Sequence, residues 1–398
     1  TFKCLKLMQN EGLPPDAVTF ICILKSCSRA HAIDKGKQIH EEIGSKGLLT
    51  KSEKLLATAV VDMYAKCGMV GKALQILQEF PLRDLVCWNA LIAGFAQQGL
   101  ASEALKCLEL IQSEGLFPDT VTLTCILMAC GYVRDFDKGQ QIHGEIVRRG
   151  FLDHDAMMGN ALIDMYVKCG MLGKAEEVIK ELPLQNVVSW STLIAGYANL
   201  NQSHNALKCF ERMQIRGFSP NTVTFVCLLK ACGQMGAIQL GKKIHYEVDS
   251  RSLLGKDIIL GNTLIDMYAK CDMLAKAQEV LEGLPARNVI TWNALIGGYA
   301  QQGQGHEALN CFERMQNEGL CPNEVTFLSV LCACSHSGLL NETRTLFENM
   351  TMNYGITPNL KHHTCMVVVF GFEGQFDNAI SVIKVMPSTS SSHVDDDP

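Results

Sequence analysis

Residues 88–99 read WNALIAGFAQQG, and this stretch returns in register along the chain. Related copies follow at a spacing of 102 residues, as WSTLIAGYANLN from Trp190 and WNALIGGYAQQG from Trp292. In the first copy the apolar residues follow the spacing of one helix face, at Trp88, Leu91, Ile92 and Phe95. Gly99 then stands where a helix is expected to end. The stretch predicts a helix, and its recurrence predicts a repeat protein.

Two other stretches alternate with the first at spacings of 102 or 103 residues. One family reads VTFICILKSC, VTLTCILMAC, VTFVCLLKAC and VTFLSVLCAC, starting at Val18, Val121, Val223 and Val325. The other reads VVDMYAKCG, LIDMYVKCG and LIDMYAKCD, starting at Val60, Leu162 and Leu264. Three unlike segments therefore follow one another as long, short and standard units. The unit boundaries fall at 17–53, 54–84, 85–119, 120–155, 156–186, 187–221, 222–257, 258–288, 289–323 and 324–359.

Each unit reads as a helical hairpin, and stacked hairpins bury a continuous core that one hairpin cannot form alone. No stretch alternates apolar and polar residues for long, so strands are not expected. We predict an all-α, right-handed α-solenoid of stacked helix-turn-helix repeats. Its parts would be a partial repeat (1–16), the repeat array (17–359), a final short repeat (360–387) and a polar disordered tail (388–398). Because Thr1 falls inside a repeat, we expect a fragment.

Composition limits the class of protein. Hydrophobic residues make up 47% of the chain and charged residues 19%, and no run approaches the roughly 18 apolar residues of a membrane helix, so we expect no membrane contact. The net charge of -6 argues against binding nucleic acid by bulk electrostatics, so such a site must be local. The 18 cysteines are spread evenly over a long chain, which favours a reducing compartment.

The alternating units, with DMYAKCG in the short unit, VTF in the long unit and WNALIAGFAQQG in the standard unit, resemble plant pentatricopeptide repeat proteins of the PLS subclass over residues 1–387. The resemblance implies single-stranded RNA as partner, one base per repeat, in the mitochondrion or chloroplast. It also implies that the chain specifies C-to-U RNA editing, or other organellar RNA processing, with a cytidine deaminase and other editing factors supplied in trans. Editing members continue into further C-terminal motifs, whereas here the last unit runs into serine-rich residues.

The resemblance further implies that the fifth and the last residue of each unit read the base. The pairs are Thr58 with Asp84 for G, Asn89 with Asp119 for U, Asn160 with Asn186 for C, Ser191 with Asn221 for A, Asn262 with Asn288 for C, and Asn293 with Asn323 for C. A carboxylate accepts from an imino N–H, whereas an amide can donate to an unprotonated ring nitrogen. The long units carry Ile21, Thr124, Val226 and Leu328 and would be spacers, giving the target 5′-n-G-U-n-C-A-n-C-C-n-n-3′.

Further contacts are implied at two other positions. Apolar second residues would flank bases by stacking, at Val86, Val188 and Ile290. Lysines at the thirteenth position of the short units would meet phosphates, at Lys66, Lys168 and Lys270. Plainer interpretations stay open: Asn and Asp are ordinary N-caps, the lysines are ordinary helix ends, and the recurring tryptophans are core.

Motifs with catalytic precedent occur but are incomplete. H-x-E recurs at His40, His143 and His245, yet the sequence has no P-C-x-x-C to complete a zinc deaminase site. The C-x4-C pairs would lie about 140° apart around a helix, which suits buried residues better than chelation. Cys67, Cys169 and Cys271 have no His and acid placed as a triad would need. We expect no enzyme site, metal or cofactor, and the alternative function is a protein-binding helical-repeat scaffold.

Overall fold

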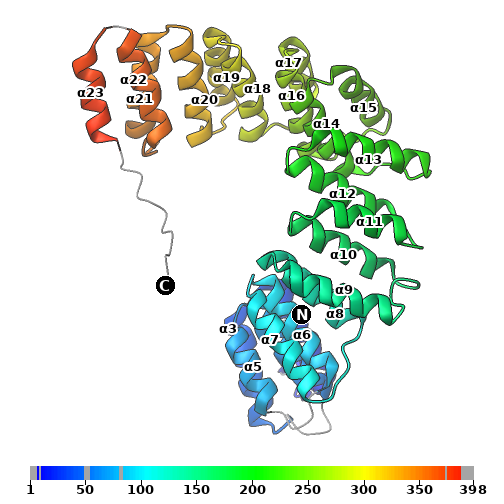
Figure 1. Cartoon of the computed structure of the whole chain (residues 1–398). Helices are drawn as coiled ribbons and strands as arrows, with labels where there is room; N and C mark the ends of the chain where they lie inside the picture. The colour runs from blue at the N-terminus through cyan, green and yellow to red at the C-terminus, as the bar shows by residue number, and fades with distance from the viewer. Residues whose placement is uncertain (1–6, 9, 49–53, 80–83, 373, 387–398) are drawn as a thin grey trace. The chain divides into compact units, whose positions relative to one another are not determined.

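The computed structural model describes residues 7–8, 10–48, 54–79, 84–372 and 374–386 of the chain. These residues form helices joined by short turns and contain no strand, which confirms the all-α prediction (Figure 1). The tail predicted at residues 388–398 and residues 1–6 and 9 of the partial repeat lie outside the described residues. In the part of the chain that is described, no helix is both long and apolar enough to cross a membrane.

The chain divides into two compact units, Thr1–Gly196 and Tyr197–Pro398. The first unit contains α2 (Ala17–Ala30), α3 (Ile33–Ser45), α4 (Lys54–Lys66), α5 (Val70–Glu79), α6 (Leu85–Gln97), α7 (Ala101–Ser113), α8 (Thr120–Val133), α9 (Phe136–Arg148), α10 (Ala156–Lys168), α11 (Leu172–Glu181) and most of α12 (Val187–Asn199). The second contains α13 (Ser203–Ile215), α14 (Thr222–Met235), α15 (Ile238–Ser250), α16 (Ile258–Lys270), α17 (Leu274–Gly283), α18 (Val289–Gln301), α19 (Gly305–Asn317), α20 (Glu324–His336), α21 (Leu340–Met352), α22 (Leu360–Phe372) and α23 (Phe376–Val385).

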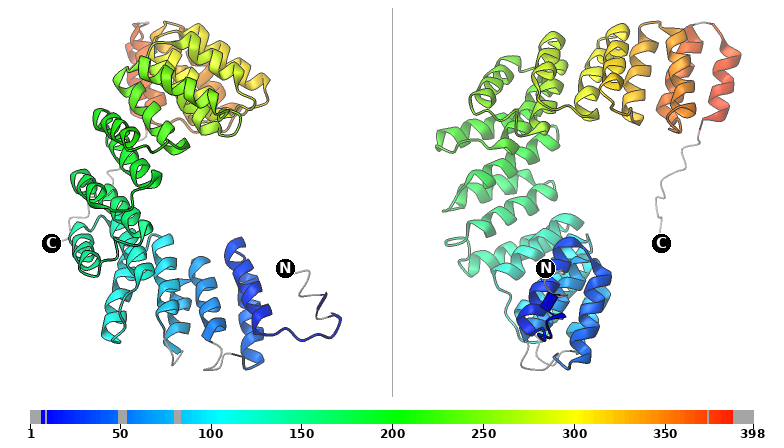
Figure 2. Two further views of the ribbon diagram at one scale, coloured as in Figure 1. Left: turned by 90° about the vertical axis from the view of Figure 1, so that its right-hand side faces the viewer. Right: turned by 180° about the vertical axis from the view of Figure 1, so that it is seen from behind.

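The even-numbered helices are the first helices of the hairpins, and within each unit they pack against one another. In the first unit α4 contacts α2 and α6, and in the second unit α16 contacts α14 and α18. Within each unit an odd-numbered helix also packs on the helix before it, as α7 does on α6 and α19 on α18. The hairpins thus stack side by side within each unit (Figure 2). This is the arrangement of a helical-repeat solenoid, in which each hairpin borrows its core from its neighbours.

The predicted apolar face of α6 is the buried face. Trp88, Leu91, Ile92 and Phe95 are all buried, and the helix ends before Gly99, whose φ of 71° is left-handed. The tryptophans are core: Trp88 donates from Nε1 to Glu114 Oε2 at 3.1 Å, and Trp292 donates to Glu318 Oε2 at 3.0 Å. The three recurring tryptophans are buried, which confirms the interpretation that they belong to the core.

The cysteines that close the long-unit first helices serve as small apolar residues. Cys27, Cys130 and Cys232 have no exposed surface, and burial raises the pKa of the Cys130 and Cys232 thiols to about 12. Their C-x4-C partners lie closer to the surface: Cys22 is exposed, and Cys125 and Cys227 are half-buried. The two cysteines of each pair thus face different surroundings, as the angle around the helix predicted. The described cysteines are all free thiols.

Candidate nucleic-acid interface

The last residue of most short and standard units caps the next first helix. Asp119 accepts from Thr122 N at 2.8 Å, and Asn288 accepts from Thr291 N at 2.9 Å. The other caps of this kind are Asp84, Asn186, Asn221 and Asn323. The N-cap interpretation is therefore correct for these side chains, which satisfy a backbone N–H that the helix leaves unpaired. Capping therefore directs one side-chain oxygen of each of these residues at the backbone N–H from which it accepts.

The fifth residue lies beside the last residue of its own unit. Asn89 donates from Nδ2 to Asp119, at 3.1 Å from Oδ1 and 3.3 Å from Oδ2. Asn293 donates from Nδ2 to Asn323 Oδ1 at 3.2 Å. In each of these pairs the two side chains are 30 residues apart in sequence, and they come from adjacent first helices. A predicted pair is thus hydrogen-bonded in each compact unit, Asn89 with Asp119 in the first and Asn293 with Asn323 in the second.

A third side chain, which was not predicted from the sequence, joins four of the six pairs. It is the third residue of the following first helix, a Thr or Ser with no exposed surface: Thr122, Ser189, Thr291 and Thr326. We call its hydroxyl the bridging hydroxyl. It donates to Oδ1 of the fifth residue at 2.6 Å for Asn89, 2.5 Å for Asn160, 2.7 Å for Asn262 and 2.7 Å for Asn293. The VTF motif contained this threonine, but its partner lies about 30 residues away.

Two of the predicted pairs differ from this pattern. In the pair of Thr58 and Asp84 the third residue is Cys87, whose Sγ lies 3.0 Å from Thr58 Oγ1 and whose N–H donates to Asp84 Oδ1 at 3.0 Å. In the other pair, Ser191 is buried in the first unit and donates to Val187 O at 2.7 Å. Asn221 caps α14 in the second unit.

The long units lack the polar arrangement. Ile21, Val226 and Leu328 occupy the fifth position, and Thr124 lies 4.0 Å from the sulfur of Met158. Where the other units have a bridging hydroxyl, the helices after three of the long units carry buried apolar residues: Leu56, Met158 and Leu260. At these three interfaces a buried apolar side chain therefore takes the place of the hydroxyl of the hydrogen-bonded triplet.

The second residues of the first helices form exposed apolar positions. Val86, Val188 and Ile290 are 59%, 53% and 61% exposed. Ten units share this feature, and the positions beyond the three predicted ones are Val18, Leu55, Val121, Met157, Val223, Ile259 and Val325. Exposed apolar side chains at one fixed position are unusual on a surface that water alone would cover.

The three lysines each form an ion pair within their own helix. Lys66 pairs with Asp62 at 2.8 Å, Lys168 with Asp164 at 2.8 Å, and Lys270 with Asp266 at 2.6 Å. The aspartate is that of the DMY motif, one turn earlier. The charge of each lysine is therefore balanced by a neighbouring carboxylate, which reduces the local positive charge available to phosphates.

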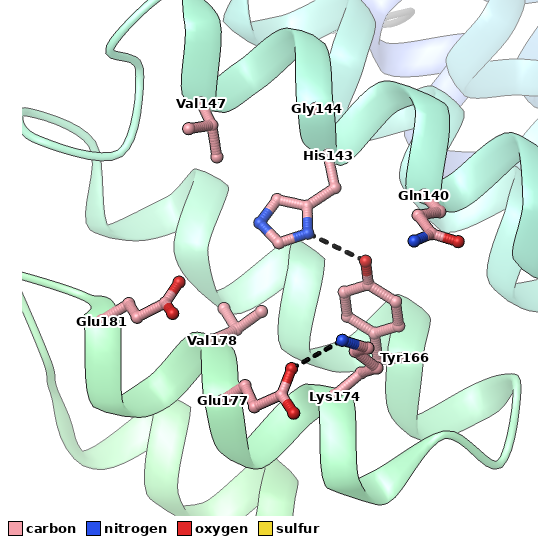
Figure 3. Close-up of a pocket in the computed structure, with 9 residues that line it drawn as sticks. All are labelled: Gln140, His143, Gly144, Val147, Tyr166, Lys174, Glu177, Val178 and Glu181. Carbon is pink, nitrogen blue, oxygen red and sulfur yellow. Dashed lines mark hydrogen bonds and ion pairs between the residues drawn. The ribbon is translucent and has the colours of Figure 1, made fainter.

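The H-x-E histidines bind tyrosines rather than metal. His143 Nδ1 lies 2.8 Å from the Tyr166 hydroxyl, and the same pair recurs as His40 with Tyr64 and His245 with Tyr268. Figure 3 shows His143 at a pocket of about 410 Å³ between α9, α10 and α11, beside the ion pair of Lys174 and Glu177. Burial lowers the pKa of all three histidines. Within the described residues no group of His, Cys, Asp and Glu is arranged to hold a metal.

Two family models match the chain, and both describe a pentatricopeptide repeat. The PPR repeat model matches residues 57–85, 160–187, 262–289 and 325–353. The PPR repeat family model matches residues 83–131, 185–234 and 287–336.

Relatives from Arabidopsis thaliana match almost the whole chain. One pentatricopeptide repeat-containing protein is 36% identical over 97% of this chain and 68% of its own length. A second is 35% identical over 97% of this chain, and a third, named mitochondrial, is 33% identical over 96%. The chain spans 55% of the length of each of the latter two.

Solved structures show the same fold. The pentatricopeptide repeat protein PPR10 from maize superimposes with a TM-score of 0.68 and 21% identity, over 96% of this chain and 60% of that protein. PPR10 in complex with an 18-nt psaJ RNA element superimposes equally well, with 20% identity over 88% of this chain and 52% of that one. The repeat models, the relatives that match from end to end and the shared stack of hairpins show that this chain belongs to the pentatricopeptide repeat family.

Proposed function

We propose that the chain binds single-stranded RNA and reads bases with the fifth and last residues of its short and standard units. The observation that carries the proposal is the contact between these two side chains, seen for Asn89 with Asp119 and for Asn293 with Asn323. A solved protein of the same fold is in complex with an RNA element. RNA recognition by one side-chain pair per helical repeat is an established mode.

Capping and base reading use different atoms of the last residue. A backbone N–H can only donate, so the atom of Asn288 that faces Thr291 N at 2.9 Å is its oxygen. The amide Nδ2 of Asn288 then points elsewhere and offers donors to a base. Asp119 uses Oδ1 in the same way and keeps a second oxygen as an acceptor. The amide suits the ring nitrogen of cytosine or adenine, and the carboxylate suits the imino N–H of uracil or guanine.

The proposed target is n-G-U-n-C-A-n-C-C-n-n, read from 5′ to 3′ with the long units as spacers. The apolar interfaces at Leu56, Met158 and Leu260 support a lack of base reading by the long units that precede them. The exposed second residues would stack on flat base faces. The lysines would reach phosphates by exchanging their aspartate partners for a phosphate oxygen.

The cellular role belongs to the same proposal. The long-short-standard order of the units supports membership of the PLS subclass, and relatives named mitochondrial or chloroplastic support an organellar location. The chain would mark a cytidine for C-to-U editing by a deaminase supplied in trans, or direct other RNA processing. Peptide binding without RNA affinity would instead support the scaffold alternative.

The test replaces the side-chain amide of one last residue by a carboxylate and keeps its role as helix cap. Asn288→Asp converts the amide to a carboxylate, and Asp caps a helix as well as Asn does. Fluorescence anisotropy at fixed salt, with RNAs that differ only at this base, should show preference moving from C to U by about tenfold, or about 1.4 kcal/mol.

The matched control is Asp257→Asn, which makes the reverse exchange at the cap of α16, after a long unit. It should leave base preference unchanged. Equal affinity of the natural chain for the target and for a shuffled RNA would contradict the proposed function.

A further inference from the structure

We infer that the bridging hydroxyl is a positioning group for base discrimination: it holds the amide of the fifth residue in one of its two orientations. The inference rests on the proposed function and adds a third residue to each reading site. The residues concerned are Thr122, Ser189, Thr291 and Thr326, which have no exposed surface and so would not touch a base themselves.

The hydrogen bonds of the first compact unit allow only one arrangement of Asn89. The carboxylate of Asp119 can only accept, so the atom of Asn89 that faces it at 3.1 Å is Nδ2. The other atom is therefore Oδ1, and it receives the hydrogen of the Thr122 hydroxyl at 2.6 Å. The hydroxyl also accepts from Asp119 N at 3.3 Å. The amide of Asn89 is thus held from both sides.

Asn262 depends more heavily on the bridging hydroxyl. Its Oδ1 receives the Thr291 hydroxyl at 2.7 Å, and that hydroxyl also lies 3.0 Å from Oδ1 of Asn288. No carboxylate is paired with Asn262, because the last residue of its unit is Asn288. Without the hydroxyl, rotation of this amide by 180° would exchange a donor for an acceptor at the base. A flipped amide would accept where the base requires donation, so bases would be discriminated less.

The chain contains its own contrast at Cys87. This residue occupies the third position of α6, and a thiol is a weak donor that leaves the Thr58–Asp84 pair with a weaker bridge. Burial raises the pKa of Cys87 to about 11, so the thiol remains protonated at neutral pH. We expect the base read by Thr58 and Asp84 to be the least strictly discriminated among the five pairs whose third residue contacts the fifth residue.

The experiment compares Thr291→Val, which keeps the shape and removes the hydroxyl, with Thr291→Ser, which keeps the hydroxyl. Affinities of the full chain for RNAs with C, U, A or G at the base of Asn262 and Asn288 are measured by anisotropy at fixed salt. The preference for C should fall about fivefold or more in Thr291→Val, as expected for one lost hydrogen bond, and should persist in Thr291→Ser. Thr122→Val should lose less at its own base, because Asp119 still orients Asn89.

The outcomes separate the inference from the proposed function. Undiminished preference in a folded Thr291→Val chain would overturn the inference and leave base reading intact. Equal weakening for all four bases, with a lower melting temperature, would show a structural role only and would also overturn it. A natural chain without base preference would overturn both. In the reverse direction, Cys87→Thr should raise the preference for G at least about twofold, and an unchanged preference would contradict the role of the hydroxyl.

Discussion

Asn288 shows how one residue can serve stability and recognition together. Its Oδ1 receives the N–H and lies 3.0 Å from the hydroxyl oxygen of Thr291, so the helix start fixes the side chain before any RNA arrives. A ligand then meets a side chain whose rotamer entropy is already lost, which lowers the cost of binding. Capping and base reading, which compete as explanations of the sequence, are compatible in the structure.

The histidines of the H-x-E motifs predict a pH dependence of stability. Burial lowers the pKa of His143, with Lys174 adding to and Glu181 opposing the shift, so the unfolded chain takes up the proton at a higher pH than the folded chain. Stability should therefore fall as pH drops below about 6.5. Urea unfolding at pH 7 and pH 5.5 measures the loss, which should be smaller when His40, His143 and His245 are all replaced by Gln. An equal loss in both chains would assign it to other groups.

At the scale of the helix, the stacking of first helices depends on small residues where two backbones approach. A Cβ built on Gly94 in α6 would lie 2.3 Å from the Cβ of Ala65 in α4 and 3.0 Å from its Cα. Neither neighbour is a flexible side chain, so one helix would have to move. By contrast, Gly144 in α9 is exposed and has open space around its Cβ position.

These two glycines give a matched prediction. Gly94→Ala should lower the free energy of unfolding by about 1–3 kcal/mol through overpacking. Gly144→Ala should raise it by about 0.5–1 kcal/mol, because alanine favours the helix. Thermal unfolding of both variants checks the two signs, and a stabilised Gly94→Ala chain would contradict the close approach of α4 and α6.

At the scale of the whole molecule, the described helices make their extensive contacts with helices that are one or two positions away in the order of the chain. Within each unit, a hairpin that lies between two others is therefore stabilised by its own packing and by both neighbours, as in other repeat proteins. Local opening of one hairpin need not unfold a distant one.

A core substitution should therefore act locally. Leu264 is fully buried in α16, and Leu264→Ala should cost about 2–5 kcal/mol. Hydrogen exchange followed by mass spectrometry should show lost protection in α14 to α18 and unchanged protection in α4 and α6. Uniform loss along the chain would instead indicate one cooperative fold.

The sequence by itself determined the hairpins, because helix periodicity and helix ends are local. Trp88, Leu91 and Ile92 showed the buried face of α6, and Gly99 showed its end. The register of the repeats placed Asn89 and Asp119 at equivalent helix starts. The pairing of Lys66 with Asp62 is equally local, four residues apart, and was open to prediction.

The tertiary structure alone decided which distant groups share a hydrogen bond. Thr122 reaches Asn89 across 33 residues, and His143 reaches Tyr166 across 23 residues. Such contacts depend on how one helix is rotated and shifted against the next, and only the packing of the complete core sets that rotation. The periodicity of a single hairpin therefore identified the helix starts but not the bridging hydroxyl that joins them.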